Sequence, residues 1–597
     1  MANLSQQRRE KMLAFLETLK EQHSDDDSLI AIGEIEKELK AKKYGLVWEE
    51  HEEAVDVQMK TQIPVFTEVK EREICADESG AYNFLLEGDN LHSLYLLEKT
   101  HKDFIDIIYI DPPYNTGSKD FVYDDSYIVK EDGYRHSKWL SFMEKRLIIA
   151  KNLLVRHGVI FIHIDDNEYA NLKLLCDSIF NEFNYLGTII QNKLNAKNDS
   201  TDIQKNHEYI LCYRKMPIYI NSTKIKPTLI KKSEKYRDAY LEGSRYYYIN
   251  DAITTRGEGG TLNARPNLGY TVYYNPNTLD KVAVCDYDTD LAKTSNDEDR
   301  IYTHRKDLID NGYEVIMPPK VRGKLGCWTW SLDKFNLDKD NIIITGKKGK
   351  YAVKKRTFVS PDNIVTIDGK LKFVSSELTN SKSIVEFSTN DGTNTFNDIF
   401  NHEIEFNNPK NIDMIEYLIS LVNKDDATIL DFFAGSGTTG HAVLKLNAED
   451  GGHRKFILCT NNENNICEEV TYERIKRVIN GYGDTEGIPA NLKYFKTDFV
   501  EKESEDLSDE LLEHIAEMIE LEHGIKVDNQ KYVMIMTDEE MDEFEKNVAD
   551  YTELKAVFVS QDILLSANQQ KLLDGLTSYV IPNYYFDFEL REAGELW

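Results

Sequence analysis

Two stretches of the sequence decide the fold: IDIIYIDPPY at residues 105–114 and TILDFFAGSG at residues 428–437. Each begins with a short, mainly apolar run, which is typical of a strand buried inside a parallel sheet. Each then opens into a loop, which is rich in proline in the first stretch and in glycine in the second. Open α/β sheets bind their ligands at the carboxyl ends of the strands. We therefore expect the two loops to line one site.

The sequence around these stretches alternates between strand patterns and helix patterns. Further strands are predicted at 84–90, 158–164 and 454–459, and helices at 91–99, 139–154, 170–180, 412–423 and 472–479. Strands that alternate with helices at this spacing predict an α/β fold with a doubly wound, mainly parallel sheet.

Charge is distributed unevenly along the 597 residues, whose formal net charge is −32. Residues 188–400 carry 33 Lys and Arg against 27 Asp and Glu, whereas residues 501–597 carry 7 against 25. Phosphate binding depends on the local field, so only the middle segment has the sign that DNA requires. The segment contains scattered strand patterns and many Gly, Asn, Tyr and Lys residues. These features indicate an inserted recognition domain. A solvated surface with chance clustering of charge is the alternative.

Several features indicate a reducing cytoplasm. No stretch approaches the ~18 apolar residues of a membrane span, and the first residues lack the apolar core of a signal peptide. The seven cysteines form no CxxC pair, so neither a disulfide framework nor a metal site is expected.

The glycine-rich loop suits a ligand that approaches the main chain. Gly435 and Gly437 remove side chains where the backbone turns sharply. Residues 435–440 also match GxGxxG, so a dinucleotide site is a competing interpretation. Glu463 follows the next strand, where a carboxylate accepts from ribose hydroxyls; Glu468 or Glu469 could take its place. S-adenosylmethionine carries that ribose without a pyrophosphate, and it is the cofactor we predict.

The proline-rich loop suits the methylation of an aromatic amine. The carboxylate of Asp111 and the carbonyl of Pro112 can accept the two hydrogens of the amine, which frees the nitrogen lone pair. Tyr114 can stack on the base, which contributes roughly 1–3 kcal/mol at other base–aromatic contacts. A base inside a duplex is unreachable and must be flipped out. Positioning of donor and amine then supplies most of the acceleration.

The ordered motifs resemble the β class of amino-methyltransferases and, within it, the modification subunits of type III restriction–modification systems. In that class the catalytic motif precedes the cofactor motif and the recognition domain lies between them, as here. Besides the two loops, the resemblance is carried by residues 43–49, 86–91, 163–168, 206–209, 408–410 and 491–495.

The resemblance implies a Rossmann-like methyltransferase sheet, circularly permuted relative to other classes, and transfer to adenine N6 in double-stranded DNA. It implies a catalytic motif of Asp111, Pro112, Pro113 and Tyr114. It also implies a cofactor site whose methionine part is held by Asp431, Phe433, Gly435, Ser436 and Gly437, with Asp89 near the adenosine end and Lys410 near the carboxylate. The Lys-Pro usual at the last position is Lys410-Asn411 here. Members typically form homodimers and pair with a separate helicase–nuclease subunit.

We predict five parts of the chain on this basis. They are an N-terminal helical arm at 1–60, a methyltransferase domain in two parts at 61–187 and 401–500, a target recognition domain at 188–400, and a small acidic α+β domain at 501–597.

Three other functions are compatible with parts of the sequence. Cytosine-N4 methylation uses the same chemistry, although Ser usually replaces Asp111 there. A nucleotide-dependent oxidoreductase would use the glycine-rich loop alone. A non-catalytic DNA-binding subunit would use the acidic tail to dock a basic partner.

Overall fold

The computed structural model describes most of the chain. The described residues are 4–22, 26–40, 48–77, 80–123, 126–129, 132–194, 203–220, 225–255, 257–404, 406–581 and 585–594. Most of the stretch 43–49, which contributed to the resemblance, lies outside them. The chain divides into two compact units, Met1–Lys231 with Asn380–Trp597, and Lys232–Thr379.

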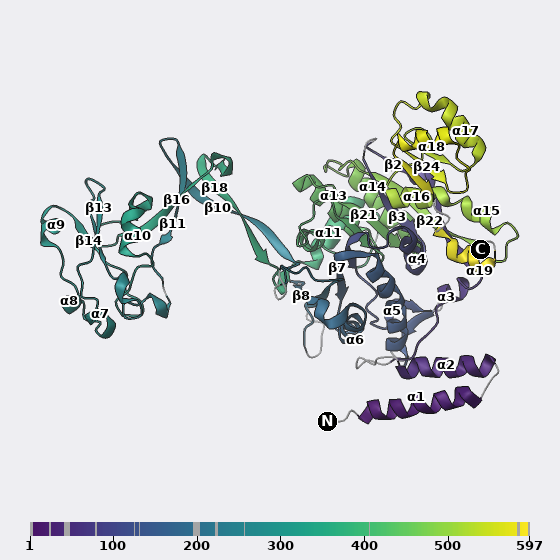
Figure 1. The fold of residues 1–597 in the computed structure, drawn as a ribbon, viewed down its shortest axis with the longest axis horizontal. Coiled ribbons are helices and arrows are strands. Elements are labelled where there is room, and N and C mark those ends of the chain that lie inside the picture. The colour runs from purple at the N-terminus through teal and green to yellow at the C-terminus, as the bar shows by residue number, and fades with distance from the viewer. Residues whose placement is uncertain are drawn as a thin grey trace. The chain divides into compact units, whose positions relative to one another are not determined.

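The first unit is built on an 11-stranded sheet with the order β1-β22-β3-β21-β20-β4-β7-β9-β8-β19, and β2 pairs with β22 (Figure 1). The strands are β1 (Gln62–Glu68), β2 (Ile74–Cys75), β3 (Tyr82–Glu87), β4 (Ile105–Ile110), β7 (Leu154–Ile164), β8 (Tyr185–Asn192), β9 (His207–Arg214), β19 (Ile384–Glu386), β20 (Thr428–Asp431), β21 (Lys455–Thr460) and β22 (Asn491–Glu501). The strands from β22 to β7 are parallel, which confirms the predicted mainly parallel α/β sheet.

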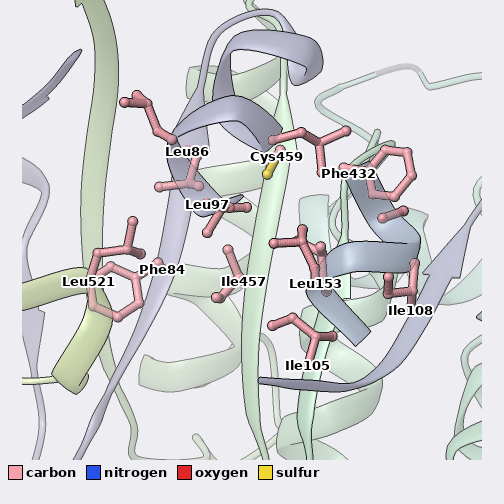
Figure 2. Packing of buried hydrophobic residues seen from close by; sticks show 14 of the residues in the cluster. Phe84, Leu86, Leu97, Ile105, Ile108, Leu153, Phe432, Ile457, Cys459 and Leu521 are labelled. Carbon is pink, nitrogen blue, oxygen red and sulfur yellow. The ribbon is translucent and has the colours of Figure 1, made fainter. Parts of the chain in front are cut away.

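Helices cover both faces of this sheet, because alternate strand residues point to opposite sides. Ile108 and Ile110 of β4 pack with α4 (Asn90–Thr100), α5 (Arg135–Leu153) and α6 (Tyr169–Cys176). Ile107 and Tyr109 pack with α11 (Thr389–Phe400), α12 (Ile412–Ser420), α13 (Thr438–Asp450) and α14 (Glu473–Asn480). Figure 2 shows the first of these cores, where Ile108 and Ile457 from the strands meet Leu97 and Leu153 from the helices. The sheet is therefore doubly wound.

Pairing of β4 with β20 brings the two motifs together. The strands are parallel, with Ile107 opposite Ile429 and Ile108 opposite Leu430. Their carboxyl ends, followed by the loops at 111–114 and 432–437, therefore lie at the same edge of the sheet. β9 runs antiparallel to β7, so it contributes its beginning to this edge.

The second unit is smaller than the predicted recognition domain at 188–400. Most of β8 and all of β9 lie inside the predicted range but belong to the large sheet, since they pair with each other and β9 pairs with β7. α11 also packs on that sheet. The predicted range includes parts of the large sheet because these strands, which lie near one edge of that sheet, carry polar residues that we attributed to the insert.

The second unit has its own core and two antiparallel sheets. The six-stranded sheet has the order β15 (Ile342–Thr345), β16 (Ala352–Val359), β11 (Arg245–Ala252), β10 (Ile230–Glu242), β18 (Lys370–Asn380) and β17 (Ile364–Ile367). The three-stranded sheet contains β13 (Lys281–Val284), β12 (Thr271–Tyr274) and β14 (Glu314–Ile316). Trp328, Phe335 and Val353 are buried between them.

The end of the chain is not the independent domain that was predicted at 501–597. A small parallel sheet of β23 (Tyr532–Ile535), β24 (Ala556–Ser560) and β25 (Ser578–Ile581) does carry its own core with α17 (Asp538–Asn547) and α18 (Ala567–Asp574). However, α15 (Leu507–Leu512) and α16 (Ile515–His523) pack into the core of the large sheet. The buried Lys493 on β22 also lies 2.6 Å from Glu520 on α16. Apolar burial and this ion pair join the segment to the first unit.

Within its described residues, the predicted arm at 1–60 contains the helices α1 (Leu4–Gln22), α2 (Asp26–Lys40) and α3 (Ala54–Gln58). None of the helices in the described parts of the chain has the length and apolar character needed to cross a membrane.

Candidate active site

The DPPY loop is held by a tryptophan on the following helix. Trp139 of α5 is fully buried, and its Nε1 donates to the carbonyl of Pro113 over 2.7 Å. Asn115, which ends the loop in a left-handed conformation (φ 56°), donates to the buried Glu168 over 2.6 Å. The carbonyl of Pro112 accepts no hydrogen bond among the described residues. The loop is thus fixed immediately after Pro112, whose carbonyl accepts no hydrogen bond from the described residues.

The two oxygens of Asp111 have different surroundings. Oδ1 accepts from the hydroxyl of Tyr114 over 2.8 Å and lies 3.2 Å from the Nζ of Lys410. Oδ2 has no hydrogen-bond partner among the described residues. The Asp111 side chain is about a quarter exposed, at 27%. One acceptor oxygen therefore remains available at the site.

Glu208, at the beginning of β9, is the centre of a charged cluster. One oxygen, Oε2, lies 3.2 Å from Lys410 Nζ and 2.9 Å from His163 Nε2, and Oε1 accepts from Lys193 over 3.0 Å. Burial opposes its charge, yet these neighbours hold the pKa of Glu208 well below its usual range. Burial also opposes the charge on Lys410, but Asp111 and Glu208 leave its pKa above the ordinary value. Both groups are therefore charged at neutral pH.

Tyr114 takes part through its hydroxyl. It donates to Asp111, accepts from Lys410 over 2.6 Å, and lies 3.3 Å from Glu208. Burial and the carboxylate of Asp111 raise the pKa of Tyr114 well above its usual value. The phenol therefore stays protonated and can keep donating to Asp111.

The glycine-rich loop is shaped by Asp431 at the end of β20. Asp431 accepts from the amide of Phe433 over 3.0 Å and from the hydroxyl of Thr439 over 2.5 Å. Burial raises the pKa of Asp431 to about 7, and the nearby charge of Asp111 adds to the effect. Gly435 and Gly437 have positive φ values of 49° and 75°, a conformation that side chains disfavour.

Two residues that sequence analysis did not single out support the loop from below. The hydroxyl of Thr471 donates to the carbonyl of Gly435 over 2.6 Å. The fully buried Arg474 donates to the hydroxyls of Ser436 and Thr438 over 3.0 and 2.7 Å. These contacts fix the main chain and the hydroxyls of the loop.

The residues present fit S-adenosylmethionine. A Cβ at Gly435 would meet no atom closer than the ring of Phe406 at 3.7 Å and the carbonyl of Phe433 at 3.9 Å, so the main chain is not tightly covered there. Glu463 is exposed just after β21, with no ion pair among the described residues, and can accept from hydroxyls. Asp89 follows β3 and caps α4, accepting from Leu91 over 2.7 Å. Phe433, whose aromatic side chain is half-buried, lies in the glycine-rich loop.

The structure brings together most of the residues predicted for the site. The charge of Asp111 contributes to the raised pKa of Asp431, after burial, so Asp111 lies near Asp431. Lys410, predicted near the cofactor carboxylate, contacts Asp111 and Glu208 instead, and its role toward the cofactor stays a prediction. Asp89 pairs with the buried Arg146 at 3.2 Å, and its cofactor role also stays a prediction.

The cluster around Glu208 was not predicted. Residues 206–209 contributed to the resemblance, but no role was assigned to Glu208, because sequence spacing does not show that β9 folds back beside β7. The apolar run that follows Glu208 was the available signal, since it predicts a strand that begins at this residue.

The sequence matches known DNA methylases. A family model described as DNA methylase, for N6/N4 methyltransferases, matches residues 105–472. The type II methyltransferase M.KpnI of Klebsiella pneumoniae is 33% identical over 389 residues, which cover 65% of this chain and 82% of that protein. The StyLTI Mod subunit of a type III restriction–modification enzyme of Salmonella typhimurium is 29% identical over 448 residues, which cover 68% of this chain and 58% of that subunit.

A solved structure described as PvuII DNA methyltransferase (cytosine-N4-specific) has a TM-score of 0.30 and 9% identity, over 66% of this chain and 87% of that one.

Proposed function

Because the chain belongs to the N6/N4 family of DNA methylases, we propose that it transfers a methyl group from S-adenosylmethionine to the N6 amine of adenine in double-stranded DNA. One observation carries the choice of an amine as acceptor. Among the described residues, Asp111 Oδ2 and the Pro112 carbonyl are two hydrogen-bond acceptors without partners, at the edge of the sheet shared with the glycine-rich loop. An exocyclic amine has two hydrogens to donate to them.

The residues of this chain would prepare the amine for attack. When bound, S-adenosylmethionine supplies an electrophilic methyl carbon on a sulfonium. Asp111 and the Pro112 carbonyl would accept the two amine hydrogens and draw the nitrogen toward tetrahedral geometry. Tyr114 would stack on the flipped base. The loop at 433–437 would hold the cofactor, with Glu463 on its ribose, so that donor and amine are positioned before reaction.

We also propose that the protein is the modification subunit of a type III restriction–modification system. Similarity to the StyLTI Mod subunit and to the EcoPI Mod subunit of Escherichia phage P1 supports this. The matched region spans 58% of the length of both Mod subunits. Residues 232–379 would serve as the target recognition domain. A homodimer, a helicase–nuclease partner and action on chromosomal DNA in the bacterial cytoplasm complete the proposal.

The test is methylation of double-stranded DNA by wild type and by Asp111→Ala. Asp111→Ala is expected to lose roughly 100-fold or more in rate, as loss of one aimed hydrogen-bonding group does elsewhere. Its affinity for S-adenosylmethionine, measured by calorimetry, should be unchanged. Asp106→Asn is the matched control, because Asp106 lies near the other end of β4 and pairs with Lys424.

The product identifies the base. Digestion of the methylated DNA to nucleosides is expected to give N6-methyladenine. N4-methylcytosine would overturn the choice of base, and full activity of Asp111→Ala would overturn the mechanism. Binding of NAD in place of S-adenosylmethionine would overturn the cofactor assignment.

A further inference from the structure

Asp111 needs a defined orientation that its own rotamers do not give. A carboxylate torsion is broad and roughly two-fold, so either oxygen of an unrestrained aspartate could face a substrate amine. Here one oxygen, Oδ1, is occupied by two donors, the Tyr114 hydroxyl at 2.8 Å and the Lys410 ammonium at 3.2 Å. The other oxygen is left for the amine.

The Lys410 ammonium is fully engaged in this arrangement. An ammonium has three N–H donors, and three oxygens surround it: Asp111 Oδ1 at 3.2 Å, the Tyr114 hydroxyl at 2.6 Å and Glu208 Oε2 at 3.2 Å. No donor remains to compete with the substrate amine for the second oxygen of Asp111. The contact with Glu208 holds the ammonium to one side of the carboxylate.

Glu208 is itself held from three sides. Besides Lys410, it contacts Lys193 and the fully buried His163, which lies on the neighbouring strand β7. The His163 ring nitrogen Nδ1 lies 3.2 Å from the hydroxyl of Tyr109 on β4. The anchor of Lys410 is therefore fixed to the sheet and not to a loop.

We propose that Glu208 and Lys410 are positioning residues of the methyl-transfer site, which lock the Asp111 carboxylate so that one oxygen stays free for the target amine. The proposal rests on the proposed function. It differs from the role that the sequence suggested for Lys410, which was contact with the cofactor. The two roles make opposite predictions for cofactor binding.

The experiment compares Glu208→Gln and Lys410→Met with wild type, and Glu520→Gln is the matched control. Glu520 is also a buried glutamate paired with a lysine that keeps a second carboxylate, because Lys493 contacts both Glu520 and Glu68 at 2.6 Å. The measurements are kcat, KM for DNA, the Kd for S-adenosylmethionine by calorimetry, and the emission of 2-aminopurine placed at the target adenine.

Both site variants are expected to lose about 10- to 100-fold in kcat, the range that misplacement of a reacting group produces. KM for DNA, the Kd for S-adenosylmethionine and the 2-aminopurine signal should stay within about two-fold of wild type. Glu520→Gln should match wild type in all four. These binding readouts do not depend on turnover, so a folding defect would be detected separately from a positioning defect.

The pH profile adds a reading that a purely structural role would not change. Glu208 is one of the two carboxylates that raise the pKa of Lys410. In Glu208→Gln that pKa should fall, so kcat should begin to decrease at a lower pH on the alkaline side than in wild type. Lys410→Met has no ammonium and should lack this limb.

Three results would overturn the proposal. The first is a tenfold weaker Kd for S-adenosylmethionine in Lys410→Met with unchanged kcat, which would make Lys410 a cofactor ligand. The second is loss of the 2-aminopurine signal in Glu208→Gln, which would place Glu208 in base flipping. The third is a kcat equal to wild type in both variants. Absence of methylation by wild type would instead refute the proposed function.

Discussion

Trp139→Phe tests whether the catalytic loop depends on one hydrogen bond from α5. Trp139 is fully buried, and its Nε1 donates to the Pro113 carbonyl over 2.7 Å. Such a bond contributes about 1 kcal/mol net, and leaving the carbonyl without a partner costs about 1–3 kcal/mol. If about 2 kcal/mol is lost from the competent loop conformation, kcat falls about 30-fold, since 1.36 kcal/mol corresponds to a factor of ten.

The assay is steady-state methylation with saturating DNA and S-adenosylmethionine, together with calorimetry of cofactor binding. Trp139→Phe should lower kcat and leave the Kd for the cofactor unchanged, because the glycine-rich loop is held by Asp431, Thr471 and Arg474. Trp328→Phe is the matched control. Its Nε1 donates to the Tyr270 carbonyl over the same 2.7 Å, in the other unit.

If the inserted unit recognises DNA, Trp328→Phe should raise KM for DNA and leave kcat unchanged. A lower kcat in Trp139→Phe together with a higher KM for DNA in Trp328→Phe would separate the role of the catalytic loop from that of the inserted unit. A kcat for Trp139→Phe within two-fold of wild type, or equal losses of kcat in both variants, would refute the reasoning.

Three other predictions concern the cofactor loop and the insert. The pKa of Asp431 is about 7 in the folded state against 3.8 as the ordinary value, so stability contributed by the protonated carboxyl is present at pH 4 and lost as the pH rises to 7. In urea unfolding, the stability of wild type should fall by up to about 4 kcal/mol relative to that of Asp431→Asn between these pH values. Parallel curves of stability against pH for the two proteins would contradict this. Gly437→Ala should cost at least about 1–2 kcal/mol of folding stability, because φ is 75° and a Cβ would lie 3.2 Å from Thr471 Cγ2, and should weaken S-adenosylmethionine binding in calorimetry. Gly451→Ala, with φ 73° at the other end of α13 and no atom within 4 Å of a Cβ, should cost about 1–2 kcal/mol from the backbone alone and leave cofactor binding unchanged. Replacing the exposed Lys347 and Lys350 with Ala should lower the magnitude of the slope of log affinity for DNA against log salt by roughly 2, at about 0.9 per phosphate contact. An unchanged slope would show that these two lysines do not contact DNA phosphates.

The sequence alone predicted the strands that carry the site, because their apolar runs are continuous. The runs at 105–110 and 428–431 form β4 and β20, and their parallel pairing places Asp111 beside the glycine-rich loop as expected. The limits of the insert were not predictable in the same way. In β9, Glu208 and Arg214 flank an apolar run, and charge alone does not distinguish a strand of the large sheet from a strand of the insert.

The contacts of Lys410 also could not be predicted from sequence. Lys410 precedes α12 and is about 200 residues from Glu208 along the chain. Their contact depends on both segments reaching the same edge of the sheet. Motif similarity suggested that Lys410 binds the cofactor, whereas the distances from its ammonium place it beside Asp111.

The order of the motifs along the chain has little physical effect on such a site. β20, β4, β7 and β9 are neighbours in the sheet, and the site uses only the ends of these strands. What matters is direction and register. β9 is antiparallel to β7, so its beginning lies beside the carboxyl ends of β4 and β7, and the register puts Tyr209 opposite Ile164 and Ile210 opposite His163.

A shift of β9 by one residue would turn every side chain to the other face of the sheet. Glu208 would then leave Lys410 and His163, and His207 or Tyr209 would take its place. Ile210 and Cys212 are buried on the α12 side of the sheet, and Leu211 and Tyr213 are buried on the other side. The shift would exchange side chains of different size and break the hydrogen bond from the Tyr213 hydroxyl to Asp177, so packing on both faces opposes it. This packing therefore also fixes the anchor of Lys410, which links an inner strand of the sheet to the orientation of Asp111.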